Sequence, residues 1–320
     1  MISVMPKQDQ RSGFLRVVAW NIEKGKRWEL LEECLKIEAI RTCDILCLNE
    51  VDDGMARSRN LDIANEIGVR LGMQVIFGAA FKEFTKGVGD ERSAPGENAR
   101  GFQGNALLTR LPIIDSLNLQ LPVCRDFFHA EEKRSGGRHA LIARLDCGSG
   151  RTLTIATTHL EVFTTTRCRA RQTGFLLQHI GAGPAVIAGD FNTNTFERGS
   201  AFHTFKSLVR LMKPDIQRAV MEPWTREHLF DELAKAGFSW TEFNDNAPTC
   251  RADLTALEDR KYVPAKIRER ILNRVRELPL RLDWIAGRGV EARMPGRTIT
   301  ELPCRPSDHL PITCDLILKT

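Results

Sequence analysis

The chain has 320 residues, of which 42% are hydrophobic and 27% are charged, and its formal net charge is +5. These values are typical of a globular protein with a full core, and the absence of a long apolar run excludes a transmembrane protein. The mild positive charge suits an anionic substrate but does not demonstrate binding to nucleic acid.

The beginning of the chain and its cysteines indicate the compartment. Residues 1–14 contain no apolar signal core and are expected to form a flexible leader. The nine cysteines are scattered, without a CxxC pair or zinc spacing, and several lie in apolar segments as buried free thiols do. We therefore expect a cytoplasmic protein whose cysteines are structural or on the surface.

Hydrophobic periodicity predicts mixed strands and helices along the chain. The expected strands lie at residues 15–20, 44–50, 73–77, 104–113, 138–145, 153–158, 185–188, 281–285 and 311–317. The expected helices lie at residues 28–41, 59–71, 166–180, 226–236 and 266–277. Strands alternate with helices in the first third and hairpins follow, which favours a layered α/β protein built on two sheets.

The domain organisation is expected to be simple. No linker rich in Pro, Gly or Ser divides the chain, so residues 15–320 are predicted to form a single domain. Residues 195–280 are mostly helical and irregular in pattern, and we expect a largely helical insert there.

Polar residues follow the predicted buried strands at six places: Asn21 with Glu23, Glu50, His159, Asp190 with Asn192, Asp283, and Asp308 with His309. One such ending is ordinary, but ordinary turns would also supply Gly, Pro and Ser at most of these places. In the stretch PAVIAGDFNTN, the period of a strand directs Asp190 and Asn192 to the same side. Gly189 leaves room there for another group to approach the backbone.

These residue types favour metal-assisted attack on phosphorus. Oxygen ligands such as Asn21 and Glu50 suit magnesium, with manganese as a substitute. A histidine held by an aspartate can orient or deprotonate water, or stabilise a phosphate when it is charged. A glycine-rich phosphate loop is absent, which argues against a nucleotide-binding fold.

Seven segments in order resemble the endonuclease/exonuclease/phosphatase superfamily: VVAWNIE, DILCLNEVD, GNALLTR, ATTHLE, AGDFNTN, RLDWIAG and PSDHLPI. The resemblance runs from about residue 15 to residue 318 and is greatest to bacterial members. It implies a four-layered α/β sandwich, in which two packed mixed β-sheets are flanked by helices. All branches of the superfamily share these segments, so they do not identify a substrate.

The resemblance implies a metal site at two of these segments and near the end of the chain. Asn21 and Glu50 match the positions that hold the catalytic Mg²⁺. Glu23 and Asp308 match acidic residues close to that metal.

The resemblance also implies the catalytic groups. His159 matches a residue that contacts the phosphate, and Asp190 and Asn192 match the pair that positions the attacking water. Asp283 matches the carboxylate that orients the catalytic histidine, which is His309 here.

Two residues are candidates for contact with the substrate, each with a simpler alternative. Asn105 in GNALLTR is a candidate hydrogen-bonding group or a turn residue, and Arg138 is a candidate substrate contact or a solvated strand edge. The arginines of TTTRCRARQT either flank the phosphate or lie on a surface helix. The aromatic content of 7%, with no basic run interleaved with aromatic residues, argues against an extended surface for stacking single strands.

We expect a Mg²⁺-dependent hydrolase that cleaves a phosphate ester by one-step attack of water, as a phosphodiesterase or nuclease, with nucleic acid as one candidate substrate. One alternative is a phosphatase or phosphodiesterase for a small or lipid-like phosphate. Another is a binding module that kept the fold and lost turnover. The sequence leaves the oligomeric state open.

Overall fold

The computed structural model describes residues 13–129, 132–194, 196, 201–254 and 264–319. Residues 1–12 of the predicted leader lie outside the described residues.

The larger sheet contains both ends of the described chain. Its strands are β1 (Leu15–Lys24), β2 (Ile45–Asp53), β3 (Gln74–Glu83), β4 (Phe102–Thr109), β6 (Arg134–Gly136), β13 (Val290–Ala292), β14 (Arg297–Thr298) and β15 (Ile312–Leu318). Within the described residues their order is β13-β15-β1-β2-β4-β3-β6, with β14 paired to β15. The central strands β1 and β2 are parallel, so their carboxyl ends reach the same edge of the sheet.

The second sheet comes mainly from the middle of the chain. Its strands are β5 (Ile113–Gln120), β7 (His139–Asp146), β8 (Thr152–His159), β9 (Ala185–Asp190) and β12 (Asp283–Arg288), in the order β12-β9-β8-β7-β5. Strands β8 and β9 are parallel, whereas β12 runs antiparallel to β9 and pairs Asp283 with Asp190. A separate antiparallel ribbon consists of β10 (Cys250–Asp253) and β11 (Glu277–Leu280).

The α-helices of the described residues are α1 (Trp28–Cys34), α2 (Glu38–Arg41), α3 (Ile63–Leu71), α4 (Thr166–Leu177), α5 (Ala201–Leu211), α6 (Ile216–Met221), α7 (Leu229–Lys235) and α8 (Ala265–Leu272). Short 3₁₀ turns are η1 (Ala56–Ser58), η2 (Gly89–Ser93) and η3 (Pro223–Thr225). Local sequence fixes several helix ends. Asp62 and Thr165 cap α3 and α4 by accepting hydrogen bonds from backbone N–H groups, and Gly72 ends α3 in a left-handed conformation.

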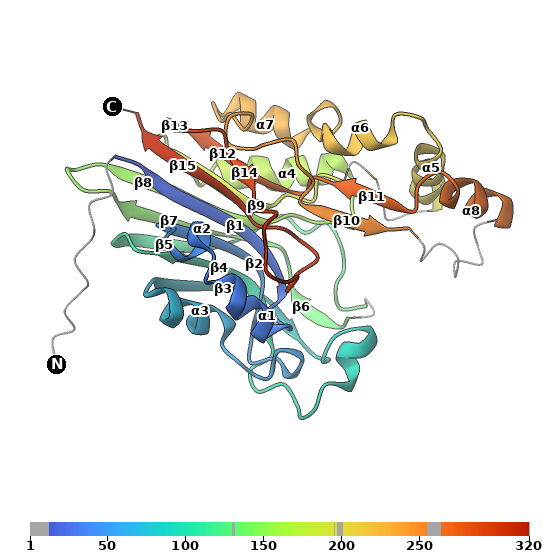
Figure 1. Cartoon of the computed structure of the whole chain (residues 1–320), viewed down its shortest axis with the longest axis horizontal. Helices are drawn as coiled ribbons and strands as arrows, with labels where there is room; N and C mark the ends of the chain where they lie inside the picture. Colours follow the sequence, from blue (N-terminus) through green and yellow to red (C-terminus); the bar gives the residue numbers. More distant parts are fainter. Residues whose placement is uncertain (1–12, 130–131, 195, 197–200, 255–263, 320) are drawn as a thin grey trace.

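The two sheets pack face to face between two helical layers, with α1 and α3 on one side and α4 and α7 on the other (Figure 1). The inner core consists of small and branched side chains from both sheets, among them Ala19, Cys47, Ile155 and Ala188. This is the predicted four-layered α/β sandwich, which the structure confirms.

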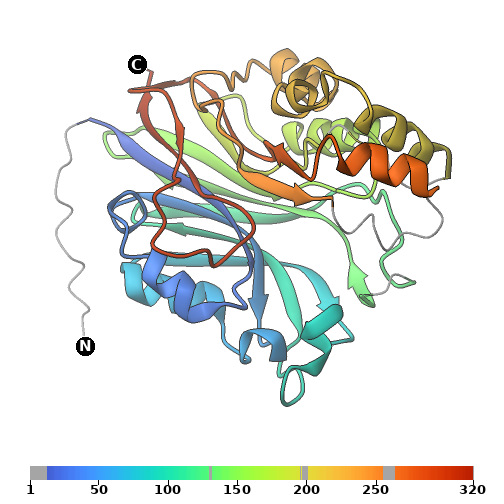
Figure 2. The same cartoon turned by 45° about the vertical axis from the view of Figure 1, so that its right-hand side comes forward.

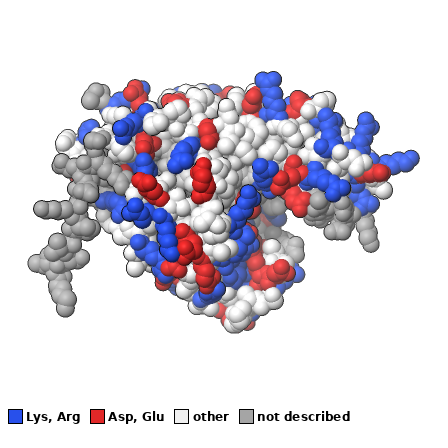
Figure 3. Space-filling view, in the orientation of Figure 1, with Lys and Arg blue, Asp and Glu red and all other residues white. Residues whose placement is uncertain are grey.

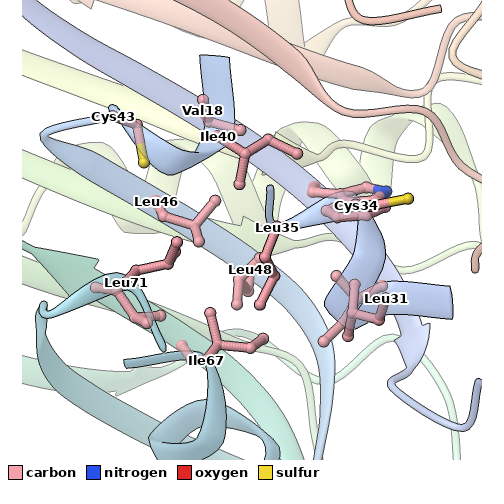
Figure 4. Close-up of a cluster of buried hydrophobic side chains, with 14 of the residues drawn as sticks. Val18, Leu31, Cys34, Leu35, Ile40, Cys43, Leu46, Leu48, Ile67 and Leu71 are labelled. Carbon is pink, nitrogen blue, oxygen red and sulfur yellow. The ribbon is translucent and has the colours of Figure 1, made fainter. Parts of the chain in front are cut away.

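A hydrophobic cluster joins the larger sheet to its helices. Figure 4 shows Leu31 and Cys34 of α1 and Ile67 of α3 in one buried cluster with Leu46 and Leu48 of β2. All five side chains are almost completely buried. Burial of such side chains contributes about 1.5–3 kcal/mol each, so this layer stabilises β2, the strand that contains Glu50.

The segment that includes α5, α6 and α8 builds a small core of its own with β11, from residues such as Leu211, Val220, Ile271 and Leu278. Figure 2 shows α5 and α8 side by side at the end of the β10–β11 ribbon. The extent of this segment as an insert, 195–280, stays a prediction.

Several predicted element boundaries were wrong. The helix expected at 28–41 is two helices, because Ile37 adopts an extended backbone and starts α2 while packing against the same core. The strand expected at 104–113 ends at Thr109, and β5 starts after Pro112, which has no N–H to donate to a ladder. The helix expected at 266–277 ends at Leu272, since Glu277 already belongs to β11.

The cysteines differ from expectation at one pair. Cys124 and Cys168 form a disulfide, whereas the other seven cysteines are free. Disulfides are rare in reducing compartments, so this pair does not fit the expected cytoplasmic location. Within the described part of the chain, every helix is too short or too polar to cross a membrane.

Candidate functional site

The predicted site residues gather where the carboxyl ends of β1, β2, β8 and β9 meet. Asn21, from the larger sheet, donates a hydrogen bond from Nδ2 to Asp190 Oδ2 of the second sheet at 3.0 Å. The two sheets are therefore joined at this edge by the side chains expected to act together. The structure brings Asn21, Glu50, His159, Asp190, Asp283 and His309 into this one region.

His309 is held on both sides of its ring and along its backbone. Its Nδ1 lies 2.8 Å from Asp283 Oδ2, and its backbone oxygen accepts a hydrogen bond from Trp20 Nε1 at 3.0 Å. Burial alone would lower the pKa of this imidazole, but Asp283 and Asp190 outweigh burial and raise the pKa well above its ordinary value. These two carboxylates therefore favour the charged form of the His309 imidazole.

Asp190 lies at the centre of the site. Its Oδ2 is 3.4 Å from His159 Nε2 and 3.9 Å from His309 Nε2, and its Oδ1 accepts a hydrogen bond from the Asn192 backbone N–H at 2.9 Å. Burial, together with the nearby Asp283 carboxylate, raises the pKa of Asp190 to about 7. This carboxyl group gains and loses its proton near neutral pH.

His159 has the opposite protonation from His309. Its ring is buried between Asp190 and Glu50, with Nδ1 3.9 Å from Glu50 Oε1. Burial, followed by the positive charge of Arg138 and that of His309, lowers the pKa of His159 well below its ordinary value. The site therefore combines a neutral imidazole with a charged one.

Three predicted residues have left-handed backbone conformations. The φ angles are +48° at Glu23, +51° at Glu50 and +52° at Asn192. Non-glycine residues adopt this region at a cost, and such residues cluster at functional sites. At Asn192 the conformation directs the side-chain amide back to the Leu160 carbonyl, to which Nδ2 donates at 2.9 Å.

The predicted metal ligands differ in how freely they offer oxygen atoms. Asn21 Oδ1 accepts one hydrogen bond, from the Glu23 backbone N–H at 3.1 Å. Glu50 Oε1 lies 3.9 Å from His159 Nδ1. Glu23 is paired with Lys26 at 2.5 Å and with Arg27. Burial would raise the pKa of Glu23, but these two cations outweigh it and lower that pKa.

Asp308 adds a carboxylate beside Glu23, whose Oε2 accepts a hydrogen bond from the Asp308 backbone N–H at 3.2 Å. Loss of hydration, followed by the negative charges of Glu23 and Glu50, raises the pKa of Asp308. Asn21, Glu50 and Asp308 thus offer hard oxygen ligands that fit Mg²⁺, and they lack a thiolate that would favour a softer metal.

Two groups of described residues also have ligand atoms within 4.8 Å of one another: Asp190, Asp283 and His309, and Cys250, Asp308 and His309. In the first group, Asp283 Oδ1 is buried without a hydrogen-bond partner. Buried polar atoms usually have such a partner, so this oxygen is an exception. The predicted ligand Glu50 belongs to neither group.

The two predicted substrate contacts line a small recess of about 10 Å³ beside the catalytic groups, together with Glu50, Phe81 and His159. Asn105 uses both ends of its amide within the protein, because Nδ2 donates to the His139 carbonyl at 2.9 Å and Oδ1 accepts from Asn49. Arg138 Nε donates to Glu161 Oε2 at 3.3 Å. Both residues therefore shape the recess through contacts inside the protein.

Asn49 is a site residue that the sequence analysis did not select. It is fully buried, and its Nδ2 donates to Asn105 Oδ1 at 2.9 Å, while its Oδ1 accepts from the Asp190 backbone N–H at 2.8 Å. One side chain thus joins β2, β4 and β9 beneath the site. The available signal was a polar residue inside the apolar run DILCLNE, next to Glu50.

The arginines of α4 lie away from the catalytic groups. Arg169 is fully buried and forms a bidentate pair with Glu227, at 3.0 and 2.7 Å. Arg171 donates to the Val123 carbonyl at 3.0 Å. Both arginines hold surrounding loops against α4. The exposed Arg171 fits the surface helix, whereas Arg169, buried and paired with Glu227, fits neither of the two alternatives.

The model of the Endonuclease/Exonuclease/phosphatase family matches residues 18–309. The chain belongs to this family. No curated protein matches the chain in sequence. The enzyme is therefore a phosphoesterase, and the residues described above lie at the edge of the sandwich where the matched segments converge.

Solved structures of similar fold extend over nearly the whole chain. A family protein from Beutenbergia cavernae is 18% identical, with 96% of this chain and 72% of that chain covered and a TM-score of 0.58. The human Nocturnin catalytic domain, with a bound sulfate anion, is 23% identical, with 98% and 96% covered and a TM-score of 0.54. ANGEL2, a 2′,3′-cyclic phosphatase solved with adenosine-2′,3′-vanadate, is 14% identical, with 96% of each chain covered and a TM-score of 0.53. At these identities the likeness shows the shared fold.

Proposed function

We propose that this phosphoesterase is a Mg²⁺-dependent phosphodiesterase, of the nuclease type, that cleaves its ester by one-step attack of water. Mn²⁺ is the expected substitute. The observation that carries the proposal is the Asp190 carboxylate, which lies among Asn21, His159 and His309 with its pKa raised to about 7.

Asn21, Glu50 and Asp308 would hold the metal, with Glu23 supporting the loop between them. A bound divalent ion would neutralise charge on a phosphoryl oxygen and on the leaving oxygen. The lysine and arginine paired with Glu23 make it a weaker ligand than Glu50.

The chain's own residues supply the proton transfers. Ionised Asp190 accepts the proton of the attacking water, since a base with a pKa near the working pH is most effective. His309, charged and fixed by Asp283, donates a hydrogen bond to the phosphate oxygen that gains negative charge. Neutral His159 and the Asn192 loop orient the phosphate on the other side of Asp190.

One protein of similar fold, ANGEL2, is a 2′,3′-cyclic phosphatase. A cyclic phosphate is a diester, so this likeness favours a diester over a monoester as the substrate. The alternative, a phosphatase or phosphodiesterase for a small or lipid-like phosphate, is the other outcome of the test below. An inert binding module is disfavoured because each matched position carries a chemically competent side chain. Cytoplasmic location stays a prediction.

The test is hydrolysis of bis-p-nitrophenyl phosphate against p-nitrophenyl phosphate, with Mg²⁺, with Mn²⁺ and with EDTA. We expect faster cleavage of the diester, loss of activity in EDTA, and a fall of at least about a hundredfold in Glu50→Gln. Faster cleavage of the monoester would instead indicate a phosphatase.

Glu291→Gln is the matched control, because Glu291 pairs with Lys319 at an exposed edge of the larger sheet. It should keep wild-type activity. Equal activity of Glu50→Gln and Glu291→Gln in Mg²⁺ would contradict the role given to Glu50.

A further inference from the structure

Three phenylalanines lie exposed near the recess. The exposed fractions are 54% for Phe84, which follows β3, 48% for Phe128 and 45% for Phe163, which follows β8. Single exposed hydrophobic side chains are ordinary on a protein surface, but here three rings from three separate segments lie near one recess, which is typical of a binding surface.

Cations lie over these rings. The Arg125 guanidinium is 4.5 Å from the centre of the Phe163 ring, and Lys133 Nζ is 5.4 Å from that of Phe128. Phe84 and Phe128 meet edge to face at 6.1 Å. We call these five residues, Phe84, Arg125, Phe128, Lys133 and Phe163, the phenylalanine platform.

The platform is continuous with the catalytic recess. Phe81 lines the recess and packs edge to face against Phe127 at 4.8 Å, and Arg125 lies 5.8 Å from the Phe127 ring. Arg134 lies 3.9 Å from the centre of the Phe81 ring. A row of rings and cations thus extends from the catalytic groups to the surface.

The acidic groups nearby are already engaged. Asp126 lies 2.5 Å from His129 Nδ1, Glu83 pairs with Arg134 at 3.4 Å, and Glu132 pairs with Lys24 at 3.4 Å. Basic and acidic side chains are interspersed over the face that Figure 3 shows, so that face carries no broad patch of one charge. The local order of rings and cations is what distinguishes the platform.

The loop that carries Arg125 and Phe128 is anchored before any ligand binds. The Cys124–Cys168 disulfide ties it to α4, and Arg171 donates to the Val123 carbonyl at 3.0 Å. A surface held in place loses less entropy on binding than a free loop does.

We propose that the phenylalanine platform binds the bases of single-stranded nucleic acid whose phosphate lies at the catalytic groups beside the recess. The proposal rests on the proposed phosphodiesterase function and names its substrate class. Proteins that bind single strands combine aromatic rings, on which bases stack, with cations for the phosphates, and the platform has Arg125 and Lys133 beside its rings. A lipid would be expected to select a continuous aliphatic patch instead. The low aromatic content of the chain argues against a surface for stacking bases, but the fold brings together phenylalanines that lie far apart in the sequence.

The test is fluorescence anisotropy with a labelled single-stranded oligonucleotide of about 12 nucleotides, as DNA and as RNA, in EDTA so that cleavage does not interfere. We expect Phe128→Ala and Phe163→Ala each to weaken binding by about fivefold to a hundredfold, as for the loss of one stacked base. Phe128→Trp should keep binding, which separates stacking from an effect on folding. A duplex of the same sequence should bind more weakly.

Phe202→Ala is the matched control, because Phe202 is 66% exposed and has Lys206 Nζ 5.6 Å from its ring centre, on α5. It should leave oligonucleotide binding and diester hydrolysis unchanged. The proposal is overturned if the wild type does not bind the oligonucleotide, if the platform variants bind as the wild type does, or if Phe202→Ala weakens binding equally.

Vesicles of phosphatidylcholine and phosphatidylserine provide the competing probe. Binding to vesicles that is lost in the platform variants, with oligonucleotide binding unaffected, would also overturn the proposal and identify a lipid surface. Hydrolysis of bis-p-nitrophenyl phosphate by the same wild-type preparation is measured separately. Failure of the proposed function is therefore distinguishable from failure of the platform.

Discussion

Asp190 and His309 share a small buried volume with Asp283, and this crowding couples catalysis to folding. The folded protein holds protons on Asp190 up to about pH 7, whereas an unfolded chain releases them near the ordinary value for aspartate. The folded state therefore binds more protons between these two pH values. Its stability from this group is fully present at low pH and is lost as the pH rises through about 7.

Asp190→Asn should therefore stabilise the metal-free protein at pH 8 and change it little at pH 4, because asparagine is neutral at both. In EDTA we expect the melting temperature to rise by roughly 3 °C or more at pH 8. Differential scanning calorimetry of the wild type and the variant measures this difference. Asp231→Asn, at an exposed position on α7, is the control. A shift of the same size at both pH values would contradict the assigned cause.

Where a polar residue comes just after an apolar run, the sequence predicted residues that the structure brings together. Asp190 is found in this way because it ends the buried strand β9, and Glu50 because it follows the apolar run at the start of β2, although β2 continues to Asp53. Asn49 is not, because its partners Asn105 and Asp190 lie 56 and 141 residues away and meet it only in the fold. The roles assigned to the individual site residues stay predictions until they are tested.

At the scale of elements, the end of β9 depends on one close approach. Gly189 has a φ of +140°, and a Cβ atom there would lie 2.3 Å from the Thr158 carbonyl oxygen and 2.6 Å from Asn49 Oδ1. The glycine thus lets β9 approach both β8 and the Asn49 side chain, which places Asp190 between the sheets.

Gly189→Ala should destabilise the protein by about 2–4 kcal/mol, from backbone strain together with the displaced neighbours. Urea unfolding measures this change in the free energy of unfolding. Gly181→Ala is the matched control, because a Cβ atom there meets nothing within 4 Å. Similar stability of the two variants would show that the close approach is not required.

Element prediction failed mainly at edges and at breaks. Strand β5 has a mostly exposed sequence, IIDSLNLQ, because it lies at the edge of its sheet with only Leu119 buried among its last residues. The local sequence pattern did not predict the pairing of β5 with β7. The division between α1 and α2 was likewise missed, because Ile37 leaves the helix to pack in the tertiary core.

At the scale of the whole molecule, neither sheet contains a complete site. The larger sheet supplies Asn21 and Glu50, the second sheet supplies His159, Asp190 and Asp283, and the loop before β15 supplies His309. Catalysis therefore requires the two sheets to be docked, and their packing was the feature that the sequence resemblance predicted best. The shape of the recess could not be predicted, because its lining comes mainly from strands of both sheets that lie far apart in sequence.

The most direct test of the account is the rate of bis-p-nitrophenyl phosphate hydrolysis by His309→Asn beside the wild type in saturating Mg²⁺. His179→Asn, at an exposed position after α4, is the matched control. We predict a fall of about a hundredfold or more for His309→Asn, with the melting temperature and far-ultraviolet spectrum showing a folded protein, and an unchanged rate for His179→Asn. A folded His309→Asn with a rate within about threefold of the wild type would contradict the claim that the Asp190–His309–Asp283 cluster is the catalytic centre.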